Sequence, residues 1–328
     1  MTHLSDTYGR SHTYLRISVT DRCNFRCVYC MPEGGLQWTP RSELLTFQEI
    51  ARIVGVMASM GIRKIRITGG EPTVRSDILA LIRAVAIIDG IDDIAMTTNG
   101  HTLDALAPRL AEAGLKRLNV SIDSLQHRRF ALLTRGGNLE RVLRGIKTAR
   151  EHGLTPLKLN VVMLRGHNED ELFDFVEYCS QHAATTTLRF IEYMPFEERR
   201  FQTVPSDELR MRLAERYTLV KGPERTVSDG PSQRITLAET GLTVGFISPL
   251  SEHFCASCNR LRLMANGHLR TCLAHEDTPS LRDLIRAGAS TLEIAEAIRL
   301  MVLGKPMGHA CEVDGGTVFE GTMTAIGG

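Results

Sequence analysis

Short β-type runs alternate with amphipathic helical segments over the first two-thirds of this sequence, and this order constrains the fold more than any other feature. Strands are predicted at Tyr14–Val19, Lys64–Thr68, Ile94–Thr98, Arg117–Ile122, Leu157–Met163 and Thr187–Tyr193. Helices are predicted at Phe47–Met60, Asp77–Ile88, Leu103–Ala113, Leu139–Glu151, Asp170–His182 and Asp207–Tyr217. Consecutive β–α units indicate an α/β fold with a parallel sheet, either open and doubly wound or curved into a barrel.

Polar residues at alternate strand positions favour the barrel. A strand buried between two helix layers is expected to be apolar on both faces, whereas period-two alternation places polar side chains together on one face. The alternating residues are Arg16 and Ser18; Lys64, Arg66 and Thr68; Asn119, Ser121 and Asp123; and Lys158 and Asn160. The alternative, solvent-facing strands, is hard to reconcile with helices flanking each strand. The shared polar face predicts a partial barrel that encloses a polar ligand.

The pattern changes after residue 222. A turn-rich linker candidate, Gly222–Pro231, precedes β-type runs at Gln233–Ala238 and Leu242–Ile247. These runs are followed by a hairpin over Leu261–Leu269 with an Asn-Gly turn and by a helix at Leu292–Val302. We therefore predict two domains, residues 1–222 and 223–328.

Composition narrows the setting of the protein. A net charge of +1 predicts no general affinity for nucleic acid. No apolar run approaches the ~20 residues of a membrane span, and residues 1–10 do not resemble an export signal. We therefore expect a cytoplasmic location, where the eight cysteines are metal ligands or spectators rather than disulfides. Cys179 lies in an apolar helical pattern and is predicted to be core packing.

Three cysteines near the start have the spacing Cys-x3-Cys-x2-Cys: Cys23, Cys27 and Cys30. Three thiolates can ligate three irons of a 4Fe–4S cluster and leave the fourth iron open to a small molecule. The alternative is zinc, although structural zinc takes four ligands, usually in Cys-x2-Cys pairs. One β–α unit later, Gly69-Gly70-Glu71-Pro72 follows a strand directly. There, glycines would let the backbone approach a ligand and Glu71 could accept from a ligand ammonium.

A second triplet, Cys255, Cys258 and Cys272, lies in the C-terminal third. Zinc stays open here, because His253 or His275 could be the fourth ligand. Arg260 and Arg262 follow on one face of a strand and could grip a phosphate chain. Together with Arg16, Arg66 and Lys158 they could converge on one polyanion.

The first triplet resembles the signature of the radical S-adenosylmethionine (SAM) superfamily. Over most of its length the chain resembles the molybdenum cofactor biosynthesis protein A family of GTP 3′,8-cyclases. The resemblance rests on Leu15–Cys27 with Met31-Pro32, Ile65–Pro72, Thr97–Gly100, Leu118–Ser124, Lys158–Asn160, Arg189–Met194, Cys255–Arg262 with Cys272, and the terminal Gly327-Gly328. It implies an incomplete (β/α)6 TIM-like barrel with a C-terminal extension carrying a second iron–sulfur cluster.

The resemblance also implies roles for individual residues. Each cysteine triplet would hold one 4Fe–4S cluster. SAM contacts would come from Tyr29, Gly70, Glu71, Ser121 and Met194. GTP contacts would come from Arg16, Arg66, Thr97, Lys158, Arg260, Leu261 and Arg262. The tail, Gly327 and Gly328, would reach into the active site and serve radical transfer. No role is assigned to residues 308–322, which include Cys311.

The implied reaction converts GTP to (8S)-3′,8-cyclo-7,8-dihydroguanosine 5′-triphosphate, the first step of molybdopterin synthesis. The implied partners are a flavodoxin- or ferredoxin-like one-electron donor and the next enzyme, cyclic pyranopterin monophosphate synthase; a homodimer is left open. Two alternatives remain. The first is a GTP-binding sensor without turnover, although the chain has no Gly-x4-Gly-Lys-Ser/Thr loop. The second is a peptide-modifying radical SAM enzyme. Residues 1–13 are too short for the peptide-recognition module of the latter.

Overall fold

The computed structural model describes residues 3–196, 200–224, 230–274, 279–309 and 323–327. Parallel strands in sequence order form the middle of one curved sheet, and each pairs with the next. They are β1 (Tyr14–Ser18), β2 (Lys64–Thr68), β3 (Asp93–Thr98), β4 (Arg117–Ser121), β5 (Leu157–Met163) and β6 (Thr186–Glu192). All six predicted strands are confirmed, with ends that differ by no more than one residue.

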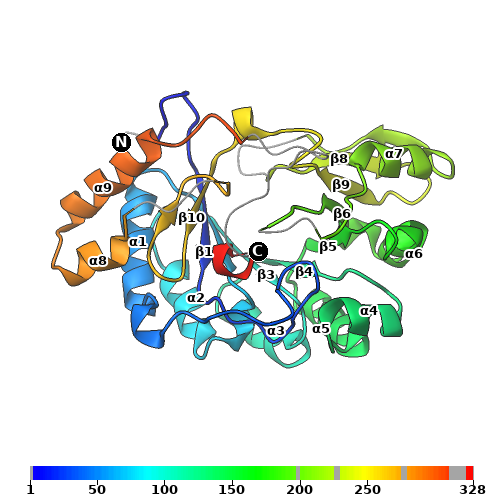
Figure 1. The fold of residues 1–328 in the computed structure, drawn as a ribbon, viewed down its shortest axis with the longest axis horizontal. Coiled ribbons are helices and arrows are strands. Elements are labelled where there is room, and N and C mark those ends of the chain that lie inside the picture. The colour runs from blue at the N-terminus through cyan, green and yellow to red at the C-terminus, as the bar shows by residue number, and fades with distance from the viewer. Residues whose placement is uncertain (1–2, 197–199, 225–229, 275–278, 310–322, 328) are drawn as a thin grey trace.

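Helices cover the outer, convex side of this sheet (Figure 1). The predicted ones are α1 (Phe47–Ser59), α2 (Ile78–Ala86), α3 (Leu103–Glu112), α5 (Leu139–Glu151), α6 (Leu172–Ser180) and α7 (Ser206–Ala214). The short helix α4 (His127–Thr134) was not predicted. At the start of α1, the Glu49 amide donates to Thr46 Oγ1 and the Thr46 amide donates to the Glu49 carboxylate, which satisfies two amides that the helix leaves without acceptors.

The C-terminal part extends the same sheet at both edges. Its strands are β7 (Leu219–Lys221), β8 (Gln233–Leu237), β9 (Thr243–Ile247), β10 (Arg260–Leu263) and β11 (Leu269–Arg270). Strand β9 pairs parallel with β6, and β10 pairs parallel with β1. The order is β11-β10-β1-β2-β3-β4-β5-β6-β9-β8-β7, so β11 and β7 form the two edges of the sheet in the described part of the chain. The expected partial barrel is therefore confirmed, while the domain division at 222/223 stays a prediction.

Alternate residues of the strands separate core from interior. On β1, Leu15 and Ile17 are fully buried in the hydrophobic core that the helices cover. On β2, Ile65 and Ile67 lie in the same core. Their neighbours, including Arg16 and Arg66, point to the concave side. The terminal helices α8 (Leu281–Arg286) and α9 (Thr291–Leu303) lie beside α1, and α10 (Met323–Ile326) lies within the arc of the sheet (Figure 1). Among the helices described, none is long and apolar enough to cross a membrane.

Candidate active site

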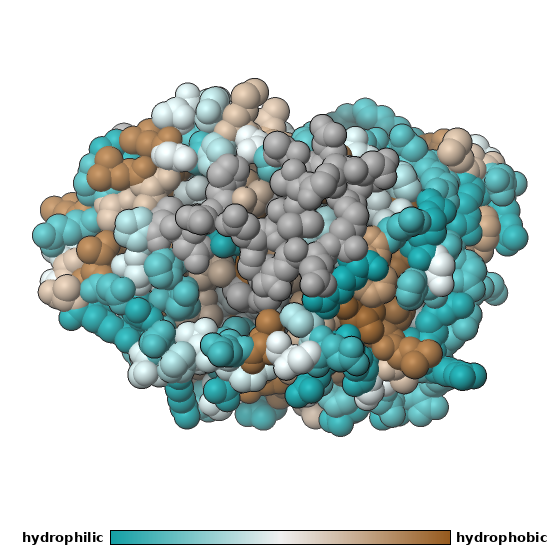
Figure 2. All heavy atoms as spheres, viewed as in Figure 1, coloured by the Kyte–Doolittle hydropathy of each residue, from teal (hydrophilic) through white to brown (hydrophobic). Residues whose placement is uncertain are grey.

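A cavity of about 300 Å³ occupies the concave side of the sheet. Both cysteine triplets line it, as do the inward-facing residues of β1 to β6 and of β10. The face of the molecule seen in Figure 2 has hydrophobic surface beside its central grey residues, whereas the surrounding rim is mostly hydrophilic. Because residues from several strands line this one cavity, the prediction that their polar faces share one interior is confirmed.

The first triplet lies in the loop that follows β1. Burial raises the pKa of Cys23 to about 11 and of Cys30 to about 12, and the nearby Cys23 and Asp123 add to the effect at Cys30. The pKa of Cys27 is raised in the same way. Buried thiols with these pKa values are protonated near neutral pH, and a metal that binds them must displace their protons. A positively charged iron group suits such a site, because its charge would compensate the negative charge of the buried thiolates.

Two glycines bring the end of β2 against this loop. A Cβ atom on Gly69 would lie 2.6 Å from the Thr20 carbonyl oxygen, and one on Gly70 would lie 2.4 Å from the Arg22 carbonyl oxygen. Real Cβ atoms do not approach so closely, so both positions require glycine. The sequence predicts that these glycines allow close approach of a ligand. The structure shows that they let one backbone segment approach another, although both also line the cavity.

Glu71 has a different setting from the one expected. Its carboxylate is fully buried and accepts four hydrogen bonds: from the Thr73 amide and hydroxyl, from the Thr98 hydroxyl and from the Asn99 amide, at 2.6–3.0 Å. Burial raises its pKa. Glu71 does not appear among the described residues that line the cavity. Its role as a contact for SAM stays a prediction, and its visible role is to join the loops after β2 and β3.

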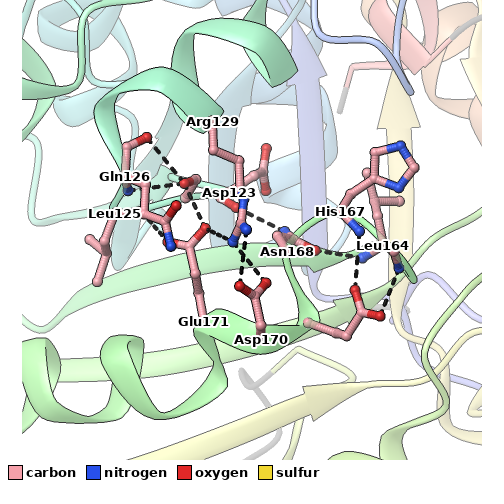
Figure 3. Close-up of polar contacts among 12 residues, drawn as sticks. Asp123, Leu125, Gln126, Arg129, Leu164, His167, Asn168, Asp170 and Glu171 are labelled. Carbon is pink, nitrogen blue, oxygen red and sulfur yellow. Dashed lines mark hydrogen bonds and ion pairs between the residues drawn. The ribbon is translucent and has the colours of Figure 1, made fainter.

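A second buried carboxylate, Asp123, fixes Tyr29 of the cysteine loop. Its Oδ2 accepts from the Tyr29 hydroxyl at 2.7 Å, and its Oδ1 accepts from the Val162 amide at 2.9 Å. Asn168 donates to the Asp123 carbonyl at 2.8 Å and so ties the loops after β4 and β5 together (Figure 3). Beside it, Glu171 accepts from Arg129 at 2.7 Å (Figure 3). The loops at the ends of the strands thus hold the cysteine loop, in addition to its own turn, in which the Cys30 amide donates to the Cys27 carbonyl at 2.9 Å.

The wall of the cavity is strongly basic. Seven lysines and arginines line it, and none of its described lining residues is Asp or Glu. The seven are Arg16, Lys64, Arg66, Lys158, Arg189, Arg260 and Arg262. Burial, followed by repulsion from neighbouring cations, lowers the pKa of Lys158 to about 6 and that of Arg189 to about 9. Concentrated like charges cost free energy, which a bound polyanion would offset.

The sequence did not single out Tyr14, Lys64 or Arg189 as ligand contacts, yet all three line this basic region. Arg189 donates from Nε and Nη2 to the Asn160 side-chain oxygen, at 3.0 and 2.6 Å. Lys64 lies 4.7 Å from the centre of the Tyr14 ring, and Arg66 donates to the Tyr14 hydroxyl. Burial would raise the pKa of Tyr14, but Arg66, Arg16 and Lys64 outweigh it and lower the pKa to about 7. The period-two pattern of β6 could have identified Arg189, since it has the alternation used for β2.

The second triplet lies around the hairpin of β10 and β11. Burial would raise the pKa of Cys258, but the charges of Arg260 and Lys305 outweigh it and lower the pKa to about 6. Arg260 and Arg262 face the cavity, as predicted, whereas Leu261 between them is fully buried in the core. Any contact of Leu261 with substrate would therefore come from its backbone, and this role stays a prediction.

The C-terminal tail lies inside the cavity region. The Gly327 carbonyl accepts from Thr68 Oγ1 at 2.7 Å, from Arg16 Nη2 at 3.1 Å and from Arg262 Nη1 at 3.4 Å. Its φ of 82° is one that side chains rarely adopt. Gly328 lies outside the described residues, as do His275 and Cys311.

The other predicted site residues lie where a ligand could reach them. Tyr29, Gly70, Ser121, Met194 and Thr97 all line the cavity. Cys179 is buried in the core, as expected. In the part of the chain that the structure describes, no three His, Cys, Asp or Glu side chains are grouped as ligands of a single metal ion. The fit of the two triplets to iron–sulfur clusters rests on their place in the cavity and on the chemistry of their thiols.

Comparisons with known proteins agree with this geometry. Residues 17–179 match the model of the radical SAM superfamily, and residues 186–311 match that of molybdenum cofactor synthesis, C-terminal part. The fold and the site thus define a radical SAM enzyme of molybdenum cofactor biosynthesis, a class that uses a 4Fe–4S cluster and SAM.

Similarity to curated proteins narrows the class to a family. The chain is 45% identical to the GTP 3′,8-cyclase of Paracoccus denitrificans, over 93% of this chain and 89% of that protein. It is 42% identical to the enzyme of Moorella thermoacetica, over 99% and 100%, and 42% identical to the mitochondrial enzyme of Arabidopsis thaliana, over 99% and 83%. The chain belongs to the GTP 3′,8-cyclase family, which adds a second 4Fe–4S cluster to its cofactors.

Solved structures show the same fold at low sequence identity. Streptococcus suis SuiB has a TM-score of 0.62 with 15% identity, over 86% of this chain and 67% of that one. Its structure bound to SAM has a TM-score of 0.59 with 16% identity, over 87% and 67%. This likeness concerns the fold alone.

Proposed function

We propose that the cavity is where this chain converts GTP to (8S)-3′,8-cyclo-7,8-dihydroguanosine 5′-triphosphate, the first step of molybdenum cofactor biosynthesis. The observation that carries the proposal is the composition of the cavity wall. Seven basic residues and both cysteine triplets line the cavity, with no Asp or Glu among the described lining residues. A nucleoside triphosphate is an anion of the size and charge that such a wall would bind.

The two triplets would hold the two clusters. Cys23, Cys27 and Cys30 would ligate the cluster that binds SAM, with contacts from Tyr29, Gly70, Ser121 and Met194. Cys255, Cys258 and Cys272 would ligate the second cluster, beside the guanine of GTP. When bound, the first cluster and SAM supply a 5′-deoxyadenosyl radical that can abstract a ribose hydrogen.

The chain's own residues would bind, orient and shield the substrate. Arg16, Arg66, Lys158, Arg260 and Arg262, with Thr97, would hold GTP, and Lys64 and Arg189 would add charge. Fixing both ends of GTP brings its ribose and its base into one reactive arrangement, which is the main contribution that a protein makes to radical chemistry. The curved sheet and the covering loops would exclude water from the radical.

The remaining partners follow from the chemistry. Radical generation requires one electron, for which we propose a flavodoxin- or ferredoxin-like donor. The product would pass to cyclic pyranopterin monophosphate synthase. A homodimer stays a prediction.

Iron analysis tests the ligand assignment. Anaerobically reconstituted protein is expected to bind about eight iron atoms per chain if each triplet holds a 4Fe–4S cluster. Changing Cys255, Cys258 and Cys272 together to Ala is expected to halve the iron content and leave SAM cleavage intact. Stoichiometric zinc, with no loss of iron in this variant, would overturn the assignment.

Nucleotide binding tests the substrate assignment. Arg262→Ala is expected to weaken GTP binding by about 1.5–3 kcal/mol, the range for a charge-assisted hydrogen bond, and to affect guanosine much less. Arg83→Ala, which removes an exposed arginine of α2, is the matched control and should change neither affinity. Equal weakening of GTP and guanosine would show that Arg262 supports the cluster loop instead of contacting phosphate.

A further inference from the structure

Lys305 is a buried lysine that the proposed reaction does not use. Only 3% of its surface is exposed, and it follows α9, far from the second triplet in sequence. Burying an ammonium group is costly unless hydrogen-bond acceptors surround it. The burial of Lys305 therefore requires acceptors for its ammonium group.

The ammonium group of Lys305 bridges the two backbone segments that lie next to Cys258 and Cys272. Lys305 Nζ donates to the Arg260 carbonyl at 2.9 Å and to the Thr271 carbonyl. Arg260 lies two residues after Cys258, and Thr271 immediately precedes Cys272. The hairpin register pairs Arg262 with Arg270, so its continuation would place Arg260 level with Cys272. Lys305 thus joins the two backbone segments of the hairpin at the end nearest to Cys258 and Cys272.

Cys255, the remaining cysteine of the triplet, is contacted by the N-terminal segment, which runs beside α9 (Figure 1). Arg10 Nη1 donates to the Cys255 carbonyl at 2.9 Å and to the Met307 carbonyl at 2.8 Å. The buried carboxylate of Asp6 fixes Arg10 through a 2.6 Å ion pair. Close packing adds to this: a Cβ atom on Gly308 would lie 3.2 Å from Cys255 Cβ. Each of the three cysteines therefore has a cation hydrogen-bonded to a backbone carbonyl of its own or within two residues of it.

We infer that Lys305 is a positioning residue for the second cysteine triplet, which it holds in place for an iron–sulfur cluster and whose thiolate charge it offsets. The inference rests on the proposed ligand assignment. It gives two separate expectations. Loss of the hydrogen bonds would loosen Cys258 and Cys272, and loss of the charge would make the cluster harder to reduce, because net charge near a cluster sets its potential.

The test uses the full-length chain with Cys23, Cys27 and Cys30 changed to Ala, so that only the second triplet can carry a cluster. In this background, Lys305→Met removes the charge and both donors at similar side-chain length. Removal of iron by a chelator is expected to accelerate about tenfold or more, the usual effect of losing an outer-shell partner. The midpoint potential of the cluster, followed by electron paramagnetic resonance, is expected to shift to more negative values. Lys305→Arg, which keeps the charge, should restore most of the potential.

Arg52→Met is the matched control, because Arg52 also donates to a carbonyl, that of Ala289 at 2.6 Å, but lies on α1. If Lys305→Met behaves like Arg52→Met in both measurements, the inference is wrong. If Lys305→Met yields no iron-loaded protein, Lys305→Arg decides: recovery of the cluster supports the inference, and failure of both variants overturns it. Retention of iron after Cys255, Cys258 and Cys272 are also changed to Ala would instead refute the ligand assignment itself.

Discussion

The Tyr29 hydroxyl donates a hydrogen bond to the buried carboxylate of Asp123 across 2.7 Å. Tyr29 lies between two cysteines of the first triplet, and Asp123 follows β4. The contact therefore couples the cysteine loop, which follows β1, to the loop after β4, in the middle of the sheet. It shows how a loop without regular structure can be preorganised by an element that is distant in sequence.

Asp123→Asn is expected to lower the free energy of unfolding by about 1–3 kcal/mol, because an amide cannot accept from both the Val162 amide and the Tyr29 hydroxyl without turning its own donor toward one of them. Denaturant unfolding measures the loss, and chelator challenge should show faster release of iron from the first triplet. Tyr29→Phe added to Asp123→Asn should cost less than it does in the wild-type chain, since the two residues share one hydrogen bond. Fully additive effects would contradict the coupling.

Stability of the nucleotide-free protein is expected to rise with pH between about 7 and 8, below the range in which the raised pKa values of Cys23 and Cys30 oppose the rise. The pKa of Lys158 is lowered to about 6 and that of Tyr14 to about 7, whereas both groups keep their protons in the unfolded chain up to about pH 10. In that window the unfolded state binds more protons, so folding becomes more favourable as the pH rises. Bound GTP should favour protonated Lys158 and therefore flatten this dependence. Thermal unfolding across this range, with and without GTP, measures both effects.

The double variant Lys158→Met with Tyr14→Phe is the control for this pH dependence. It lacks both titrating groups, so its thermal stability should respond less to pH than that of the wild type. An unchanged slope in the double variant would show that other groups cause the dependence.

Deletion of Gly327 and Gly328 is expected to abolish cyclisation of GTP while both clusters load and SAM cleavage continues. The Gly327 carbonyl contacts Arg16 and Arg262, two of the proposed GTP ligands, so the tail would act on radical transfer and not on radical generation. The yields of 5′-deoxyadenosine and of cyclised GTP give the measurement. If the truncated protein makes both at wild-type rates, the tail has no role in the reaction.

Gly327→Ala is a milder version of the same test. An added Cβ would lie 3.0 Å from Ser18 Cβ, and the left-handed conformation costs alanine roughly 1–2 kcal/mol. The ratio of seated to released tail should therefore fall roughly 5- to 30-fold, with a partial loss of cyclised product. Thr291→Ala, at the start of the outlying helix α9, serves as a control and should leave the product ratio unchanged.

Glu71→Gln is expected to lower the free energy of unfolding by about 1–3 kcal/mol. The carboxylate accepts from Thr73, Thr98 and the Asn99 amide, and the amide group of glutamine would leave at least one of these donors without an acceptor. Glu112→Gln, at an exposed position of α3, should leave stability unchanged in the same denaturant titration. A loss of SAM affinity with unchanged stability would instead support the ligand contact first predicted for Glu71.

The local pattern of the sequence determined the middle of the fold. Alternation within β1, β2, β4 and β5 depends only on the backbone repeat of a strand, so the inward direction of Arg16, Arg66 and Lys158 could be predicted without knowing which strands are neighbours. The capping box at Thr46 is equally local. The spacing of each cysteine triplet also indicated metal binding, because ligand type and separation limit what can bind, although it left zinc open at the second triplet.

Only the tertiary structure decided where distant segments meet. Strands β9 and β10 are close in sequence, yet they join the sheet at β6 and β1, on opposite sides of the cavity. Nothing local specifies these partners, since strand pairing depends on how the whole sheet curves. The same reason explains Glu71, whose carboxylate accepts from Thr73, Thr98 and Asn99 and does not line the cavity. It also explains Lys305, whose acceptors lie 45 and 34 residues away. The chemistry of a buried polar group follows from its neighbours in space, and the folded chain alone supplies them.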